Sequence, residues 1–129
     1  MQVGPSSTLV TDPRSAAALF ADLLAGPHER AAVLYLDPEW RFLGRAVFTG
    51  RGDAIAPPLR AIIAEAFRLD AAVLVLGHTH PSGCPDPSPA DVAYTRALVR
   101  VAQALDLVVA DHLILAGGQV TSFRAAGLL

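Results

Sequence analysis

The sequence predicts an α/β fold in which a mixed β-sheet is flanked by helices. The chain has 129 residues and is 53% hydrophobic, which is the length of one ordinary domain and ample material for a core. Helical and extended patterns alternate in the order α-β-β-α-β-α-β-β. The apolar run AAVLVL at 71–76 is typical of a central strand covered on both faces. We therefore expect three layers, α/β/α.

The first half of the chain predicts a helix, a hairpin and a second helix. Asp12 as N-cap and Pro13 in the first turn mark the start of a helix over Arg14–Ala25. Strands at 31–36 and 41–48 are predicted around a turn at 37–39, followed by a turn-rich stretch at 49–54. Pro57-Pro58 opens a helix over 59–69, whose apolar stripe should face the sheet: Leu59, Ile62, Ile63 and Phe67.

The second half of the chain predicts the remaining elements. The strand at 71–76 leads into a proline-rich loop over 77–89, and a long helix follows at about 90–105. A strand at 108–116 turns at Gly117-Gly118 into a last strand at 119–123. We interpret residues 1–11 as a flexible lead-in and residues 12–129 as one domain.

Composition excludes several kinds of chemistry. All ten basic residues are arginine, so this chain has no lysine for a Schiff base. The net charge of −2 does not suggest a nucleic-acid-binding protein. Cys84 is the single cysteine and cannot form an internal disulfide, which favours the cytoplasm. We find neither a signal-peptide pattern nor a membrane-span pattern, and we expect a soluble protein.

Two histidines and an aspartate carry the pattern of a metal site. His78 and His80 follow the predicted central strand, and residues two apart in an extended chain project to the same side. Together with Ser88 and Asp91 they form H-x-H-x(7)-S-x(2)-D. Two histidines and one carboxylate are the ligand set of an open zinc site, in which water takes the fourth position. The sequence therefore predicts a catalytic Zn²⁺ bound by His78, His80 and Asp91.

The same residues also have a purely structural interpretation. His78 and His80 could be surface loop histidines, and Ser88-Pro89-Ala90-Asp91 is the pattern of a helix N-cap with proline in the first turn. The cap and the metal site are compatible, because a capping serine places Asp91 in the first helical turn, close to the strand end.

At these residues the sequence resembles the RadC family of the JAB/MPN (JAMM) metal-dependent peptidase superfamily. The string HTHPSGCPDPSPAD is similar to the family pattern H-N-H-P-S-G-x-x-x-P-S-x-x-D, and the segments at 111–114, 122–124 and 127–129 are similar to its closing part. The resemblance runs from about Pro27 to Leu129. It implies a cytidine-deaminase-like α/β fold and a zinc hydrolase that cleaves peptide or isopeptide bonds.

The sequence departs from the family pattern in three places. Thr79 stands where asparagine is usual, Ala125-Ala126 stand where acids are common, and the N-terminal helix-hairpin-helix region of longer relatives, which is linked to DNA, is absent. A deaminase is disfavoured, because its H-x-E and P-C-x-x-C ligands are absent.

The chemistry also needs a base to take the proton of the attacking water. Of the three glutamates, Glu39 lies in a predicted turn, which leaves Glu29 and Glu65 as candidates. The resemblance assigns the catalytic role to Glu29, with Glu65 as the alternative base; the structural interpretation of Glu65 is a helix-surface residue paired with Arg68. The resemblance also implies that the Ser88 hydroxyl stabilises the oxyanion.

Asp111 and His112 have two interpretations of equal weight: a buried, hydrogen-bonded pair within a strand, or support for the metal ligands. For the whole chain, a zinc hydrolase competes with a DNA-repair-associated module that has a structural metal, and with an inactive scaffold. Retention of all three ligands argues against a scaffold. Salt-dependent DNA binding would distinguish the DNA-associated module.

Overall fold

The computed structural model describes residues 8–49 and 56–129. The elements are α1 (Pro13–Ala18), the 3-10 helix η2 (Ala21–Leu24), β1 (Arg30–Leu36), β2 (Phe42–Thr49), α2 (Leu59–Arg68), β3 (Val73–Thr79), α3 (Pro89–Ala104), β4 (Val108–Ala116) and β5 (Gln119–Ser122). The predicted order of helices and strands is confirmed, with η2 added. Most of the predicted lead-in (residues 1–7) and the predicted turn from residue 50 on lie outside the described residues.

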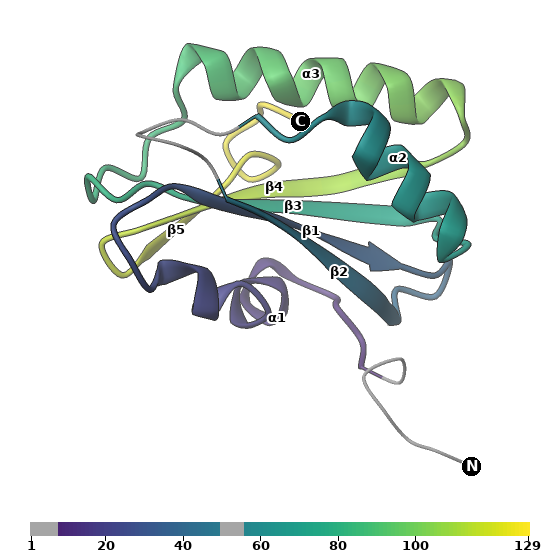
Figure 1. Cartoon of the computed structure of the whole chain (residues 1–129), viewed down its shortest axis with the longest axis horizontal. Helices are drawn as coiled ribbons and strands as arrows, with labels where there is room; N and C mark the ends of the chain where they lie inside the picture. The colour runs from purple at the N-terminus through teal and green to yellow at the C-terminus, as the bar shows by residue number, and fades with distance from the viewer. Residues whose placement is uncertain (1–7, 50–55) are drawn as a thin grey trace.

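Five strands form one mixed sheet in the order β2-β1-β3-β4-β5 (Figure 1). β1 pairs antiparallel with both β2 and β3, β3 pairs parallel with β4, and β4 pairs antiparallel with β5. Every residue of the central strand β3 is buried. This burial is what the unbroken apolar run predicted.

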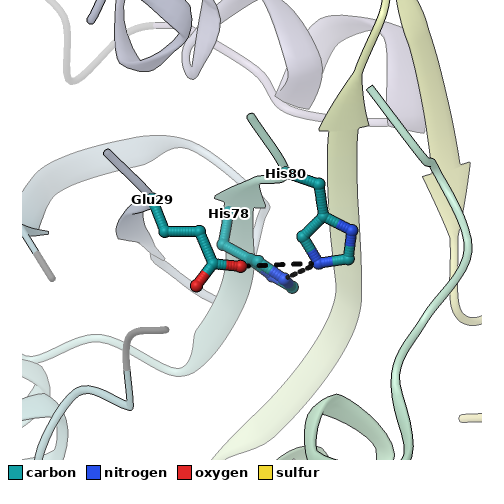
Figure 2. A group of neighbouring side chains, drawn as sticks. All are labelled: Glu29, His78 and His80. Carbon is teal, nitrogen blue, oxygen red and sulfur yellow. Dashed lines mark hydrogen bonds and ion pairs between the residues drawn. The ribbon is translucent and has the colours of Figure 1, made fainter. Parts of the chain in front are cut away.

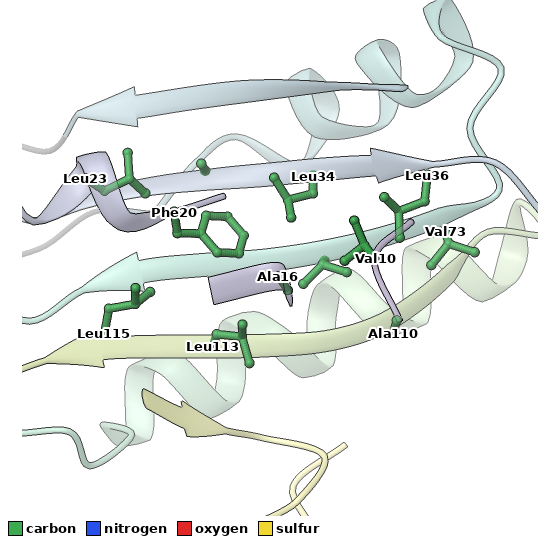
Figure 3. Packing of buried hydrophobic residues seen from close by; sticks show 12 residues of the cluster. Val10, Ala16, Phe20, Leu23, Leu34, Leu36, Val73, Ala110, Leu113 and Leu115 are labelled. Atoms are coloured by element: carbon green, nitrogen blue, oxygen red, sulfur yellow. The ribbon is translucent and has the colours of Figure 1, made fainter. Parts of the chain in front are cut away.

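Helices cover both faces of the sheet, with α2 and α3 on one face and α1 on the other (Figure 1). The buried apolar side chains accordingly form two clusters. The α1-face cluster includes Phe20, Leu34, Leu36 and Leu113 (Figure 3). The α3-face cluster includes Val33, Ile62, Leu76 and Leu98. None of the helices in the described ranges is long and apolar enough to cross a membrane.

The residues just before α1 are tied to the hairpin. The Val10 backbone N–H donates to the Trp40 carbonyl at 2.9 Å, and the Phe42 N–H donates to the Thr8 carbonyl at 2.7 Å. The Val10 side chain is buried in the α1-face cluster. Residues 8–10 therefore pack against the rest of the domain.

The predicted first helix is wrong in extent. It begins as expected, since the Asp12 carboxylate accepts from the Ser15 N–H at 2.7 Å and Pro13 lies in the first turn. It ends at Ala18, however, and the chain re-forms as η2. Between the two helices the fully buried Phe20 ring packs on Gly77, where an added Cβ would lie 2.7 Å from ring carbons. Burial of Phe20 outweighs the helix propensity of this alanine-rich segment.

Helix α2 is confirmed, but one member of its predicted apolar stripe is not. Ile62 is buried, and Leu59 and Ile63 pack against the α3-face cluster. Phe67 is 59% exposed. Ala66 takes the buried position instead, because it lies four residues after Ile62 on the same helix face.

Strand β3 is longer than predicted at its carboxyl end. It continues through Thr79, so His78 lies inside the strand rather than after it. The extension is stabilised from both sides, since His78 pairs with Ala31 of β1 and with Ile114 of β4. His80 is the first residue beyond the strand.

Strand β4 contains one extra residue relative to β3. Leu74 pairs with Val109 and Val75 pairs with Asp111, which leaves Ala110 as a bulge. A one-residue insertion reverses which side chains face which layer. As a result Val109 and His112, three residues apart, both point to the face covered by α3, whereas Leu113 packs in the α1-face cluster.

Candidate metal centre

The candidate site lies where β3 ends, beside the start of β1 and the start of α3. Because β1 runs antiparallel to β3, the residue before β1, Glu29, lies next to the carboxyl end of β3. The Arg30 N–H donates to the Thr79 hydroxyl at 3.0 Å and closes this junction. Figure 2 shows Glu29, His78 and His80 turned toward one another.

Two imidazoles and two carboxylates converge at this place. The Nε2 atoms of His78 and His80 lie 2.8 Å apart. The Asp91 carboxylate lies 3.4 Å from His78 Nε2 through Oδ1 and 3.2 Å from His80 Nε2 through Oδ2. Glu29 Oε1 lies 3.6 Å from His80 Nε2. Glu29, His78 and His80 offer ligand atoms that all lie within 4.8 Å of one another, so this cluster can hold a metal ion.

The orientation of His80 is set by the proline-rich loop that follows it. His80 Nδ1 lies 2.9 Å from the Cys84 carbonyl oxygen, which can only accept a hydrogen bond. A neutral His80 therefore carries its proton on Nδ1, which leaves the lone pair on Nε2, the nitrogen that lies near the carboxylates of Asp91 and Glu29. Two imidazole nitrogens and two carboxylates at one place are a set of ligand atoms that fits a divalent metal ion.

Asp91 is held in position by the start of α3. Its Oδ2 accepts from the Ser88 N–H at 2.9 Å, and its own N–H donates to Ser88 Oγ at 3.0 Å, which is the predicted cap. Burial raises the pKa of Asp91, but the nearby His78 imidazole and the Ser88 backbone N–H more than offset it and hold that pKa well below its usual range. Asp91 is therefore ionised at neutral pH.

A cavity of about 260 Å³ opens beside the cluster. Glu29, His78, Ser88 and Asp91 line it, together with apolar and aromatic side chains including Ala31, Leu76 and Tyr94. The Tyr94 hydroxyl donates to the Pro57 carbonyl and so joins α3 to the segment before α2. Ser88 and Glu29 thus line the same cavity as His78 and Asp91.

The structure does not bring two of the sequence candidates to this site. Glu65 lies on α2, where Arg68 pairs with both of its carboxylate oxygens at 2.7 Å. Asp111 accepts from the backbone N–H groups of His112 and Arg124 and from the Ser122 hydroxyl, so it ties β4 to the C-terminal segment. Neither residue contacts His78 or His80 through an ion pair or hydrogen bond among the described residues.

His112 does reach the site. Its Nε2 lies 2.7 Å from His78 Nδ1, and its ring stacks on Phe123 with centroids 4.3 Å apart. Burial, and next the electrostatic influence of His78, lower the pKa of His112 to about 3, so its ring is neutral at physiological pH.

Sequence reasoning missed Thr95 and the Cys84 carbonyl. Thr95 lies 2.6 Å from His112 Nδ1 through its hydroxyl. Its spacing of four residues from Asp91 on one helix face was the available signal. A backbone carbonyl carries no residue-type signal, so the contact of Cys84 with His80 could not be predicted.

Comparison with known proteins identifies the family of this chain. A family model described as a RadC-like JAB domain matches residues 10–128. A UPF0758 protein of Acaryochloris marina is 42% identical over 123 residues, covering 93% of this chain and 50% of the relative. UPF0758 proteins of Methylibium petroleiphilum and Rhodobacter capsulatus are each 41% identical, covering 83% and 80% of this chain and 49% of each relative.

The chain thus spans about half the length of the curated relatives it matches. The family match covers nearly the whole chain, including the two histidines, Asp91, and Glu29 at the start of β1. This chain belongs to the RadC-like JAB domain family.

Proposed function

We propose that this chain is a zinc-dependent hydrolase that cleaves a peptide or isopeptide bond. The observation that carries the proposal is the convergence of two imidazole nitrogens and two carboxylates beside a cavity. Such a set of N and O donors, with room beside it, is the pattern of a catalytic zinc site rather than a closed structural one.

His78 Nε2, His80 Nε2 and the Asp91 carboxylate are the proposed ligands. Asp91 lies within 3.4 Å of both histidine Nε2 atoms, whereas Glu29 lies 3.6 Å from His80 Nε2 and within 4.8 Å of a ligand atom of His78. This difference leaves Glu29 for another role. Zinc bound there would lower the pKa of a water molecule toward neutrality and polarise the carbonyl of the substrate.

Glu29 is the proposed general base. Its side chain is buried and lines the cavity, and its carboxylate is 3.6 Å from His80 Nε2. From there it can accept a proton from the attacking water and pass it to the leaving amine. Ser88 lines the same cavity, and its oxygen accepts from the Asp91 N–H. Its hydroxyl also hydrogen-bonds with the Asp91 carboxylate, and we propose that it turns from there to donate to the oxyanion.

The test combines metal analysis with a substrate screen. Purified wild-type protein, Glu29→Gln and His80→Ala are analysed for bound zinc and offered a library of linear and lysine-branched peptides. We expect the wild type to bind zinc and cleave, and His80→Ala to do neither. Glu29→Gln should bind zinc but lose at least about 100-fold in turnover, which is the range of general-base catalysis.

Glu65→Gln is the matched control, because Glu65 is paired with Arg68 on the surface of α2. It should cleave as well as the wild type. Full activity of Glu29→Gln together with inactivity of Glu65→Gln would show that Glu65, and not Glu29, is the general base. A wild-type protein that neither binds zinc nor cleaves any library member would contradict the proposal as a whole.

A further inference from the structure

A series of buried hydrogen bonds connects α3 to Nδ1 of His78. The Thr95 hydroxyl donates to the Asp91 carbonyl oxygen at 2.8 Å and lies 2.6 Å from His112 Nδ1. His112 Nε2 then lies 2.7 Å from His78 Nδ1. Thr95 is 1% exposed and His112 is 3% exposed, so water does not compete for these contacts.

With both histidine rings neutral, only one placement of the Thr95, His112 and His78 protons satisfies all of these hydrogen bonds. The Asp91 carbonyl oxygen can only accept a hydrogen bond. Thr95 has a single hydroxyl proton and donates it to that carbonyl. The Thr95 oxygen must then accept from His112 Nδ1–H. A neutral His112 has no proton left on Nε2, so His78 must donate from its own Nδ1.

The opposite polarity has two forms. In one, Thr95 turns its proton to His112 and gives up the hydrogen bond to the Asp91 carbonyl. In the other, His112 is a charged imidazolium, enclosed by Phe123, Thr95 and His78 with no carboxylate side chain hydrogen-bonded to it among the described residues, and such a buried charge is strongly disfavoured. Only the neutral arrangement above keeps all three contacts, and it leaves the lone pair of His78 on Nε2.

We propose that Thr95 and His112 are positioning residues that hold His78 in its Nδ1–H tautomer and so direct the Nε2 lone pair of His78 at the metal. The inference rests on the metal site of the proposed function. Metal-bound histidines commonly donate their other N–H to a carboxylate or carbonyl; here the acceptor is a neutral histidine whose own tautomer is set by a threonine. Helix α3 thus supplies one ligand, Asp91, and controls a second one.

The test compares Thr95→Val with Thr95→Ser. Valine keeps the branched shape but removes the hydroxyl, whereas serine keeps the hydroxyl. The first readout is ¹⁵N NMR of the histidine tautomers in metal-free protein at about pH 8, where free imidazoles are neutral. We expect His78 to be protonated on Nδ1 in the wild type and in Thr95→Ser. It should be mixed or protonated on Nε2 in Thr95→Val.

His80 is an internal control in the same spectra, because the Cys84 carbonyl and not Thr95 holds its Nδ1 proton. The second readout is zinc affinity by competition with a chelator. Thr95→Val should bind zinc about 10-fold to 100-fold more weakly, as for other losses of a ligand-orienting hydrogen bond, and Thr95→Ser should bind nearly as tightly as the wild type.

A second pair of variants covers the case in which Thr95→Val does not fold. His112→Gln keeps an acceptor for His78, and His112→Leu does not, so only the leucine variant should change the His78 tautomer. An unchanged His78 tautomer in Thr95→Val or His112→Leu would overturn the inference, as would an equal change at His80. Failure of the wild type to bind zinc would instead contradict the proposed function, because the tautomer readout needs no metal.

Discussion

Three polar side chains of the candidate metal centre are held in place by hydrogen bonds to other residues. His80 donates to the Cys84 carbonyl, Asp91 accepts from the Ser88 N–H, and His78 contacts His112. Side chains held in this way lose little further rotamer freedom when they bind an ion. At the scale of single residues, the site is therefore preorganised rather than assembled by its ligand.

Asp91→Asn tests the charge at this centre. The amide oxygen can still accept from the Ser88 N–H, so the cap of α3 should survive. The loss of the anion should weaken zinc binding by at least about 100-fold, because a neutral amide is a poor zinc ligand. Calorimetric titration with zinc and helix content by circular dichroism are the measurements. The control is Asp86→Asn, which neutralises an exposed carboxylate of the loop before α3. Equal affinity losses in both variants would contradict the assignment.

Ser88 serves as the cap of α3 and as the proposed oxyanion donor, and two substitutions separate these roles. Ser88→Ala should cost about 1 kcal/mol of unfolding free energy, whereas Ser88→Gly should cost only a few tenths, because glycine is an acceptable N-cap. Both variants should lose about 100-fold in kcat, since both lack the hydroxyl. Unfolding in urea and peptide turnover are the readouts. A turnover loss that follows stability, large in alanine and small in glycine, would remove Ser88 from the chemistry.

At the scale of elements, the break between α1 and η2 positions a ring against the strand that carries the site. Phe20 occupies the space above Gly77, the residue before His78. The absence of a side chain at Gly77 is therefore a packing requirement. The bulge at Ala110 acts similarly on β4, because it turns His112 toward α3 and His78.

Gly77→Ala should destabilise the protein by about 1–3 kcal/mol, because the new methyl group would overlap the buried Phe20 ring. In a Phe20→Leu background the same substitution should cost at least about 1 kcal/mol less, since the smaller side chain leaves room. Unfolding free energies of the wild type, the two single variants and the double variant complete the cycle. If the losses of unfolding free energy in the two single variants simply add up in the double variant, the Phe20 ring and the new methyl group are not in steric contact.

At the scale of the whole molecule, both tyrosines join layers. The buried Tyr35 of β1 donates to the Ile62 carbonyl of α2 at 2.9 Å, and Tyr94 of α3 donates to the Pro57 carbonyl. Burial raises the pKa of Tyr94 to about 12 and that of Tyr35 farther still, with the Glu65 charge a smaller cause at Tyr35. Both hydroxyls therefore remain protonated while the layers stay packed.

The free energy of unfolding should accordingly fall as pH rises above about 10. Unfolded tyrosines release their protons there and the folded ones do not, so the folded state binds more protons. Tyrosinate absorbance at about pH 11 should be low in the folded protein and rise when urea unfolds it. Tyr35→Phe should flatten the alkaline loss of stability. A tyrosinate midpoint near 10 in folded protein would contradict the prediction.

The sequence by itself determined the order of elements and most of their bounds. Turn residues and apolar runs are local signals, and Val108–Ala116 was predicted at its observed bounds. The cap of α3 and the H-x-H spacing were local as well, so His78, His80 and Asp91 could be named as ligands in advance. The place of Glu29 next to β3 came from resemblance to the family and not from any local pattern.

Only the tertiary structure decided the end of the first helix, the exposure of Phe67 and the face on which His112 lies. The helix ends where Phe20 packs on Gly77, and Phe67 is exposed because other α2 residues face the sheet. The face of His112 is set by the one extra residue in β4. The contact of Thr95 with His112 likewise joins α3 to β4, 17 residues apart. Local propensity describes what a segment can form, whereas packing between distant segments selects among those forms and brings their side chains together.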